Sequence, residues 1–428
     1  MKKNIFETII IGGGHAGLSA SYYLKTLGIK HIVFERGRVG ESWRSQRWDS
    51  FLMNTSNRVN VLPGDNYTGK FPEGFCTAGS FVSSLEAYVS KFELPVAEQV
   101  EVISLEKEEG QPYFTVIVSE KGIQKNYKSR QVIICSGGQN EKKIPAFATN
   151  LPAGIAQLHA GQYRNASQLP DGAVLVTGSA QSGCQITEDL LDSGRKVFLS
   201  TSMVARIPRR YRGKDCIDWL LMMGFFNLKT QEVADPKVFS MKPPQLSGTG
   251  DGTRTMSLQD LARKGAVILG RMIDVNENKI LFNKDAHEHV KFADEFSKKA
   301  KDMIDGFISK NQLTAPPPDE DPADMPDTNA ACASSIISLT LKDHNIQSII
   351  WSTGFNSNFS YVKFPVLDTN GNPIHKNGMT EIEGLYFLGL PWLRSRKSAL
   401  INGIKDDAEF ITDRVYKYAR QRDMSYEI

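Results

Sequence analysis

The sequence has few cysteines, and none of them forms a Cys-x-x-Cys pair. The five lie far apart, as Cys76, Cys135, Cys184, Cys216 and Cys332. A disulfide framework or a zinc site needs cysteines at paired or close spacing. A flavin disulfide reductase needs a redox pair to pass electrons to its substrate. The sequence therefore argues against all three classes.

Long apolar runs and a strong net charge are also absent. No uninterrupted apolar run approaches the roughly 20 residues of a membrane helix. The N-terminus enters a strand directly, in FETIIIGGG, without the apolar region and cleavage site of a secretory signal. The formal net charge is +3, too small to indicate nucleic acid or a membrane surface as a partner. We expect a cytoplasmic protein without either partner.

The 428 residues are enough for two or three domains. A short apolar strand, a glycine turn, a helix and a second strand form a βαβ unit over residues 5–35. A second such unit covers residues 172–202, and this pair is the only internal repeat. Outside these units, we expect strands over 98–108, 113–120, 128–138, 346–355 and 384–390, helices over 81–94, 286–312 and from about residue 398, and a loop over 314–327.

The first glycine turn fits Gly-x-Gly-x-x-Gly at Gly12, Gly14 and Gly17. In such a turn the first glycine permits the tight bend, the second lets the backbone approach a pyrophosphate, and the third lets helix and strand pack closely. The pyrophosphate then lies at a helix N-terminus, which favours anions. Glu35 ends the next strand, where a carboxylate binds a ribose 2′-hydroxyl. The alternative is a structural turn with an exposed Glu35.

The second turn, GSAQSG, keeps Gly178 and Gly183 but has Ala180 in the middle. The methyl group would hold the backbone slightly further from a pyrophosphate. At the end of the following strand, Ser200 and Thr201 stand where the first unit has its carboxylate. Hydroxyl groups do not repel a 2′-phosphate, whereas a carboxylate about 4 Å away would cost about 4 kcal/mol. The first turn therefore suits FAD or NAD, and the second suits NADPH.

Basic residues follow the second unit in RIPRRYRGK, and Arg206 is the candidate for binding the 2′-phosphate, with Arg209 and Arg210 nearby. The alternative is a solvated charged face. Two different dinucleotides in one chain indicate that NADPH reduces FAD, since a simple dehydrogenase would need only one.

Several motifs resemble class B flavin-containing monooxygenases, in the YUCCA-like and bacterial flavoprotein branch. They are GGGHAGL, GESWRSQRWDSFLMNTSN (40–57), HAGQYR (159–164), GSAQSG, QLSGTGDG (245–252) and IIWSTGF (349–355). His159 and Tyr163 match the second half of the family signature, whereas Ala153 and Ile155 occupy its Phe and first Gly positions. Tyr163 in place of Trp favours subsets other than the Baeyer–Villiger enzymes.

The resemblance implies an α/β fold with two Rossmann-like domains, the NADPH domain being inserted into the FAD domain. The expected limits are 1–165 for the first part of the FAD domain, 166–330 for the NADPH domain and 331–428 for the second FAD part. The segment Ser352, Thr353 and Gly354 resembles the linker between the domains. Asn54 is the candidate catalytic residue, beside the reactive face of the flavin; the alternative is that it only caps a turn.

The expected cofactor-binding residues fall into two groups. For FAD they are Gly12, Gly14, His15, Ala16, Gly17, Glu35, Arg36, Ser42, Trp43 and Val102. For NADPH and the linker they are Gly178, Ala180, Gln181, Ser182, Gly183, Ser200, Thr201, Arg206, Thr353 and Gly354. We expect no metal site.

The activity implied by the resemblance is NADPH-driven reduction of FAD, formation of a flavin C4a-hydroperoxide with O₂, and transfer of one oxygen atom to a small organic substrate, such as an amine, a sulfide, or an indolic or keto compound. Arg394, Arg396 and Lys397 would add positive charge near the flavin, bind an anionic substrate, or face solvent. One alternative is a flavin reductase or oxidase that passes electrons to a carrier or to O₂ as peroxide. Another is a regulatory flavoprotein. A homodimer is compatible with the sequence.

Overall fold

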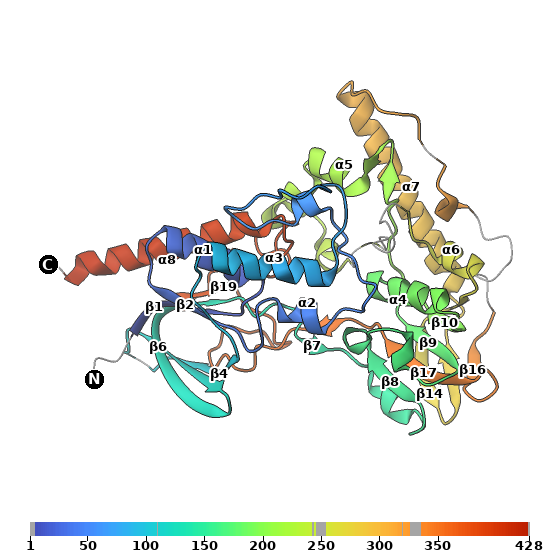
Figure 1. Ribbon diagram of the computed structural model, residues 1–428, viewed down its shortest axis with the longest axis horizontal. Helices are drawn as coiled ribbons and strands as arrows, with labels where there is room; N and C mark the ends of the chain where they lie inside the picture. Colours follow the sequence, from blue (N-terminus) through green and yellow to red (C-terminus); the bar gives the residue numbers. More distant parts are fainter. Residues whose placement is uncertain are drawn as a thin grey trace.

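The computed structural model describes residues 5–108, 110–241, 244, 254–318, 320–325 and 335–426, with side chains to residue 422. Cys332 and the stretch 245–252 lie outside the described residues. Two sheets stand side by side, each with its own helices (Figure 1). Of the helices in the described ranges, none combines the length and the apolar character needed to cross a membrane.

The first sheet is built around the N-terminal βαβ unit. Its strands are, in spatial order, β3 (Val96–Ala97), β2 (His31–Phe34), β1 (Ile5–Ile11), β6 (Ile123–Ile134), β5 (Phe114–Glu120) and β4 (Val100–Glu106), with β19 (Leu385–Phe387) also paired to β6. The pairs among β3, β2, β1, β6 and β19 are parallel, and β5 and β4 add an antiparallel hairpin. The helices of this unit are α1 (His15–Thr26), α2 (Glu41–Ser45), α3 (Ala78–Lys91) and α8 (Ile404–Tyr426).

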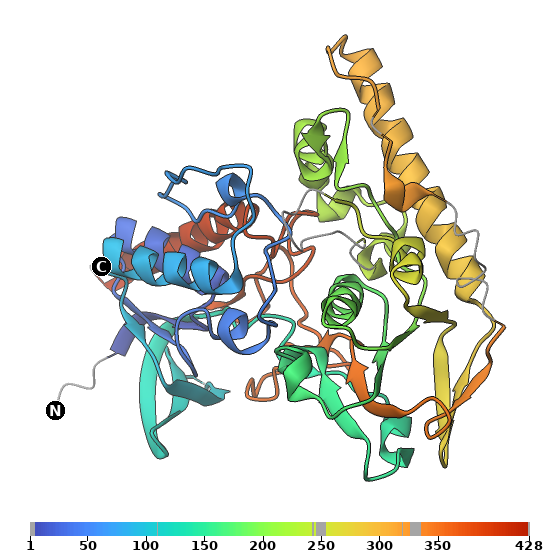
Figure 2. The same ribbon diagram turned by 45° about the vertical axis from the view of Figure 1, so that its right-hand side comes forward.

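The second sheet is parallel throughout. Its order is β13 (Val267–Leu269), β10 (Val197–Ser200), β9 (Ala173–Thr177), β17 (Ile346–Trp351) and β8 (Ala156–His159). Its helices are α4 (Gln181–Asp192), α5 (Cys216–Met222), α6 (Leu258–Arg263) and α7 (Ala286–Lys310), and α7 extends away from the rest of the unit (Figure 2). Small sheets join β11 (Arg210–Tyr211) to β12 (Lys214–Asp215), and β14 (Met272–Asn276) to β15 (Lys279–Phe282) and β16 (Ser338–Thr340).

The chain passes between the two sheets twice, and the two passages pair with each other. β7 (Glu141–Lys142) leaves the first sheet and β18 (Phe355–Asn356) returns to it, as an antiparallel ribbon. The expected insertion of one α/β unit into the other is therefore confirmed.

The second sheet takes strands from all three expected segments of the chain. β8 precedes residue 166 and β17 follows residue 330, yet both pair within this sheet. Limits at 165 and 331 would thus divide the sheet. We propose that the inserted unit runs from about residue 144 to about residue 354, between the two strands of the ribbon.

The expected elements are present, but the last helix starts later than about residue 398. α8 begins at Ile404, because Ala399 has a left-handed backbone (φ 68°) that a helix cannot continue. The Ser398 hydroxyl also accepts the N–H groups of Arg394 and Ser395, both at 3.1 Å, which closes a turn before the helix.

Candidate dinucleotide sites and their junction

The two glycine turns have the same backbone geometry. Gly12 has φ 110° and Gly178 has φ 105°, a conformation that side chains disfavour. A Cβ added at Gly12 would lie 2.5 Å from the carbonyl oxygen of Cys135, and one at Gly178 would lie 2.5 Å from that of Ser352. Each turn is thus pressed against the end of the next strand of its sheet, as a close helix–strand approach requires.

The third glycines serve the same packing role. A Cβ at Gly17 would overlap the carbonyl of Gly12, and a Cβ at Gly183 would overlap the carbonyl of Gly178. The expectation that both turns need glycine at these places is supported by the contacts themselves.

The middle positions differ only in the side chain. Gly14 has φ −82° and ψ −176°, and Ala180 has φ −74° and ψ −177°, which any residue adopts. A Cβ at Gly14 would meet no atom within 4 Å. The backbone at Ala180 therefore has no need of glycine.

Both turns leave a helix N-terminus available to an anion. Neither Gly14 nor Ala180 makes a side-chain cap, and neither α1 nor α4 has an acidic residue in its first turn. The unsatisfied N–H groups and the positive end of the helix dipole then favour a phosphate. Both sites fit a dinucleotide pyrophosphate, and the residues His15, Ala16, Gln181 and Ser182 lie in these first turns.

Glu35 ends β2 beside the first turn. Its Oε2 accepts the N–H of Gly13 at 2.6 Å, and its Oε1 accepts that of Gly37 at 2.8 Å. Burial raises the pKa of this carboxyl, and the two N–H groups partly oppose the shift. A carboxylate has about four acceptor sites, so two remain for ribose hydroxyls.

The other residues expected around FAD surround this turn. Arg36 is exposed, and Val102 lies on β4, which starts beside Glu35 because the N–H of Val100 donates to the Glu35 carbonyl at 2.9 Å. Ser42 and Trp43 lie on α2. The Trp43 ring packs edge-on against Phe81, with centroids 5.1 Å apart.

Ser200 and Thr201 end β10 as expected, but both hydroxyl groups are buried and bonded within the protein. Ser200 Oγ donates to the carbonyl of Gly270 at 3.0 Å. Thr201 Oγ1 donates to the carbonyl of Leu269 at 2.6 Å and contacts His289 Nδ1 at 2.8 Å. No carboxylate stands at this position, as expected, but contact of these hydroxyls with a 2′-phosphate stays a prediction.

The surroundings of Arg206 do not suit its expected role of binding the 2′-phosphate. Its side chain is 1% exposed, and its guanidinium donates to Asp294 and Asp324, each at 2.5 Å. A buried arginine with two carboxylate partners would have to exchange them to bind a phosphate, at a large cost. This geometry disfavours Arg206 as the residue that binds the 2′-phosphate. Arg210 is exposed and donates to the carbonyl of Gly213 at 2.9 Å.

Asn54 joins the two units. Its Nδ2 donates to Oε1 of Gln181 at 2.8 Å, and its Oδ1 accepts from Nε2 of Gln185 at 3.0 Å. Arg209 Nη1 donates to the Asn54 carbonyl at 2.9 Å, and Arg209 is itself paired with buried Asp215. Two residues one turn apart on α4 therefore bind both ends of the Asn54 amide. Gln185 was absent from the expected site, and only its i, i+4 spacing from Gln181 could have suggested it. Arg209 was expected near the 2′-phosphate and not beside Asn54.

The segment that carries Asn54 runs alongside α4. At its other end, Ser50 Oγ donates to Asp189 Oδ1 at 2.5 Å, and Tyr163 donates to Asp189 Oδ2 at 2.6 Å. The segment between Ser50 and Asn54 is thus tied to both ends of the helix that opens the second turn.

His159, from the family signature, holds the linker. Its Nδ1 accepts the N–H of Gly161 at 3.1 Å, so Nε2 carries the proton and donates to the carbonyl of Gly354 at 2.8 Å. Burial lowers its pKa, which favours this neutral form. Thr353 also donates, to the carbonyl of Lys143 on the other passage. Thr353 and Gly354 thus join the two passages.

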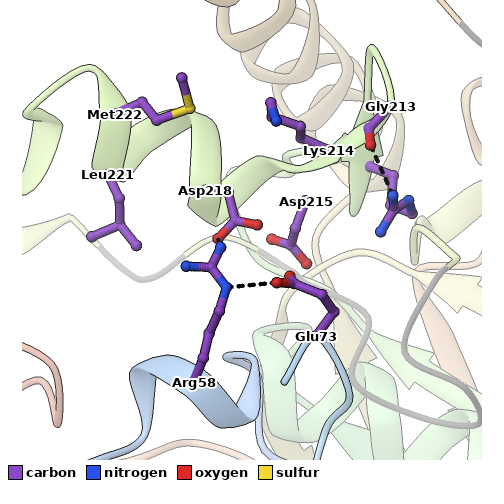
Figure 3. Close-up of a pocket in the computed structure, with 9 residues that line it drawn as sticks. Arg58, Glu73, Gly213, Lys214, Asp215, Asp218, Leu221 and Met222 are labelled. Atoms are coloured by element: carbon purple, nitrogen blue, oxygen red, sulfur yellow. Dashed lines mark hydrogen bonds and ion pairs between the residues drawn. The ribbon is translucent and has the colours of Figure 1, made fainter. Parts of the chain in front are cut away.

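A cavity of about 390 Å³ lies between the loop that carries Arg58 and the segment 210–222 (Figure 3). Arg58 crosses its base, pairing with Glu73 at 2.8 Å and with Asp218 at 2.5 Å. Asp215 also lines this cavity. Asp215 pairs with Arg209, and Arg209 donates to the Asn54 carbonyl. The wall of the cavity is therefore connected to Asn54 through these two side chains.

The basic residues before α8 have different partners. Arg394 contacts Asp407 at 3.6 Å and Lys397 pairs with Asp406. The Arg396 guanidinium instead lies 3.9 Å from the centroid of the Phe225 ring. Nearby, His15 Nε2 lies 3.1 Å from the carbonyl oxygen of Ala399, which ties the first turn to this segment.

Within the described residues, no group of three His, Cys, Asp or Glu side chains is placed to hold a metal ion. The four described cysteines are all free thiols. Burial raises the pKa of Cys135, Cys184 and Cys216, that of Cys216 to about 12. Thiols with raised pKa are poor nucleophiles, which disfavours disulfide chemistry at these three residues.

Two equivalent nucleotide turns in two joined α/β units define a flavin-dependent oxidoreductase. Residues 9–212 match the family model of pyridine nucleotide-disulphide oxidoreductases. The chain is 31% identical over 419 residues to a CzcO-like oxidoreductase of Geobacillus kaustophilus, covering 97% of this chain and 100% of that one. It belongs to the family of the CzcO-like oxidoreductases.

More distant similarities are found to monooxygenases. The chain is 27% identical over 221 residues to a probable indole-3-pyruvate monooxygenase, YUCCA3 of Arabidopsis thaliana, covering 49% of each. A flavin-containing monooxygenase from Stenotrophomonas maltophilia has a similar fold, with a TM-score of 0.63, 16% identity, and coverage of 96% of this chain and 98% of that chain.

Proposed function

We propose that this protein is a monooxygenase that uses FAD at the first turn and NADPH at the second, and that transfers one oxygen atom from O₂ to a small organic substrate. The observation that carries the proposal is the Asn54 contact with Gln181 and Gln185, which joins the segment beside the first site to the first turn of the second helix. The substrate class includes amines, sulfides, and indolic or keto compounds.

Bound FAD would accept hydride from NADPH and activate O₂. The chain's own residues hold and orient the groups. Glu35 and the N-termini of α1 and α4 bind the nucleotides. Asn54 has its amide orientation fixed by two glutamines, and it offers one remaining N–H donor and one remaining acceptor site to a ligand. Preorganised donors of this kind stabilise developing charge without reorganisation.

The oxidase alternative differs in where the oxygen goes. An oxidase releases one peroxide for each NADPH consumed, with every substrate, whereas a monooxygenase releases less peroxide when its substrate is present. The test is NADPH consumption against peroxide release over a panel of amines, thioethers, and indolic and keto acids. The proposal is supported by a substrate that lowers the peroxide yield and is converted into its oxygenated product. Full peroxide yield throughout the panel contradicts it.

A further inference from the structure

Arg47 follows α2 and lies against two aromatic rings. The central carbon of its guanidinium is 4.5 Å from the centroid of the Trp43 ring and 5.3 Å from that of Phe51. Contacts of this kind hold the guanidinium plane in place. Arg47 Nη1 donates to the carbonyl of Gln46 at 2.8 Å. Its position is therefore fixed, while most of its N–H groups remain available.

No carboxylate among the described residues neutralises this cation. Across that part of the chain, Arg47 forms no ion pair, and its guanidinium donates to a backbone carbonyl. Burial lowers its pKa to about 10, so it is still charged at neutral pH. Charged groups removed from water are normally paired, because an uncompensated one costs folding free energy.

Arg164 adds a second cation beside it. The Arg164 guanidinium donates to the carbonyls of Arg47 and Ser45, at the C-terminal end of α2. It too has no ion pair among the residues that the structure describes. Asp49 is the acidic residue closest in sequence to Arg47, but its carboxylate accepts a hydrogen bond from Asn165 Nδ2 at 2.5 Å. One end of α2 thus carries two positive charges that no carboxylate of the described residues pairs with.

The other end of α2 reaches the first nucleotide turn. The N–H of Gly40, before α2, donates to the carbonyl of Gly13 at 3.4 Å. α2 lies on the side of the first unit that faces the second in both views (Figures 1 and 2). A ligand between the two units is therefore within reach of the Arg47 side.

We propose that Arg47 binds an oxyanion of a ligand held between the two units, with Arg164 keeping Arg47 in place through the backbone. A guanidinium offers parallel N–H groups that match the oxygens of a phosphate or a carboxylate. The oxyanion has two sources, a phosphate of a bound dinucleotide or the carboxylate of an acidic substrate. Only the second source rests on the proposed oxygen transfer.

The experiment compares Arg47→Leu and Arg47→Lys with the matched control Arg44→Leu. Arg44 lies on α2, three residues before Arg47, and its guanidinium already pairs with Glu86. Three affinities are measured without turnover: for FAD by retention and reconstitution, for NADP⁺ by calorimetry, and for benzoate as a carboxylate probe by its effect on the flavin spectrum. We expect Arg47→Leu to weaken one of them by about tenfold or more, as loss of a charged hydrogen bond does. Arg47→Lys should recover part of the loss, and Arg44→Leu should change none.

The affinity that falls identifies the source. A lower affinity for FAD or NADP⁺ assigns the oxyanion to that nucleotide's phosphates, and a lower affinity for benzoate alone assigns it to a substrate carboxylate. If all three affinities stay at wild-type values in folded Arg47→Leu and Arg47→Lys, the proposal is overturned, whether or not the unfolding temperature changes. Because none of these measurements involves oxygen transfer, their outcome is independent of the peroxide test.

Discussion

The side-chain Nδ2 of Asn54 donates to Oε1 of Gln181 at 2.8 Å, although the two residues belong to different nucleotide units. Gln181 is the first residue of α4, where the second dinucleotide's pyrophosphate would bind. Gln185, also on α4, donates to Asn54 Oδ1 at 3.0 Å. The helix that opens the second turn is thereby connected to the segment that carries Asn54.

Gln185 should be needed for this connection. Gln185→Leu removes the donor to the half-buried Asn54 Oδ1, which should cost about 1 kcal/mol of folding free energy. The freed amide should also slow the reduction of the flavin by NADPH. Stopped-flow absorbance measures this rate, and chemical unfolding measures the stability.

The matched variant is Gln181→Glu, which retains an acceptor for Asn54. We expect it to keep the flavin reduction rate at saturating NADPH but to weaken NADPH binding, since it places a negative charge where the pyrophosphate would lie. An unchanged reduction rate in Gln185→Leu would mean that the contact serves stability alone.

Arg206 should matter for stability rather than for nucleotide choice. Arg206→Ala leaves Asp294 and Asp324 without their shared cation. Because both carboxylates are partly exposed, we expect a loss of about 2–3 kcal/mol, below that for a fully buried pair. The ratio of kcat/KM for NADPH to that for NADH should not change. A fall in kcat/KM for NADPH without a matching fall for NADH would instead indicate that Arg206 binds the 2′-phosphate.

Two alanine variants of the first turn should separate packing from ligand contact. Gly17→Ala places a Cβ on the carbonyl of Gly12, so we expect it to prevent folding of the turn. Gly14→Ala adds a methyl that meets no protein atom within 4 Å, so its unfolding temperature should match the wild type in the absence of FAD. Its affinity for FAD should fall. Equal FAD affinity in Gly14→Ala would show that the methyl of Ala180 is neutral as well.

Glu35 should make FAD binding dependent on pH. Burial raises the pKa of the Glu35 carboxyl, so this group becomes protonated at a higher pH in the native protein than in the unfolded chain. The group's contribution to the stability of the FAD-free protein therefore rises as the pH falls through this range. A protonated carboxyl accepts fewer hydrogen bonds than a carboxylate. FAD affinity should therefore fall as the pH is lowered through the pKa of Glu35, which lies above the ordinary value of 4.5. Titration of the FAD affinity checks this, and Glu35→Gln should be flat where the wild type changes.

Local pattern was enough to predict both nucleotide units. Each unit depends on glycines that lie close together in sequence. Gly12 and Gly178 have nearly the same φ because each turn packs against a backbone carbonyl at the end of the neighbouring strand. The limits of the inserted unit were displaced because β8 pairs with β17, almost 200 residues later, and sequence periodicity carries no information about such pairing.

The partners of Arg206 could not be predicted, for a similar reason. A run of arginines predicts a phosphate site or a solvated face, but the partners that bury Arg206 come from α7 and from the loop around Asp324, far along the chain. Asn54 was proposed from its motif, whereas its contact with Gln185 depends on the packing of α4 against the segment that carries Asn54, which local sequence does not encode.

The most direct measurement mixes NADPH-reduced enzyme, with NADP⁺ still bound, with O₂ in a stopped-flow spectrophotometer. The account predicts a flavin C4a-hydroperoxide that forms before oxidised flavin returns, and that decays faster when an oxygen-accepting substrate is present. Direct return to oxidised flavin, with one peroxide released per NADPH and no effect of any substrate, would contradict it.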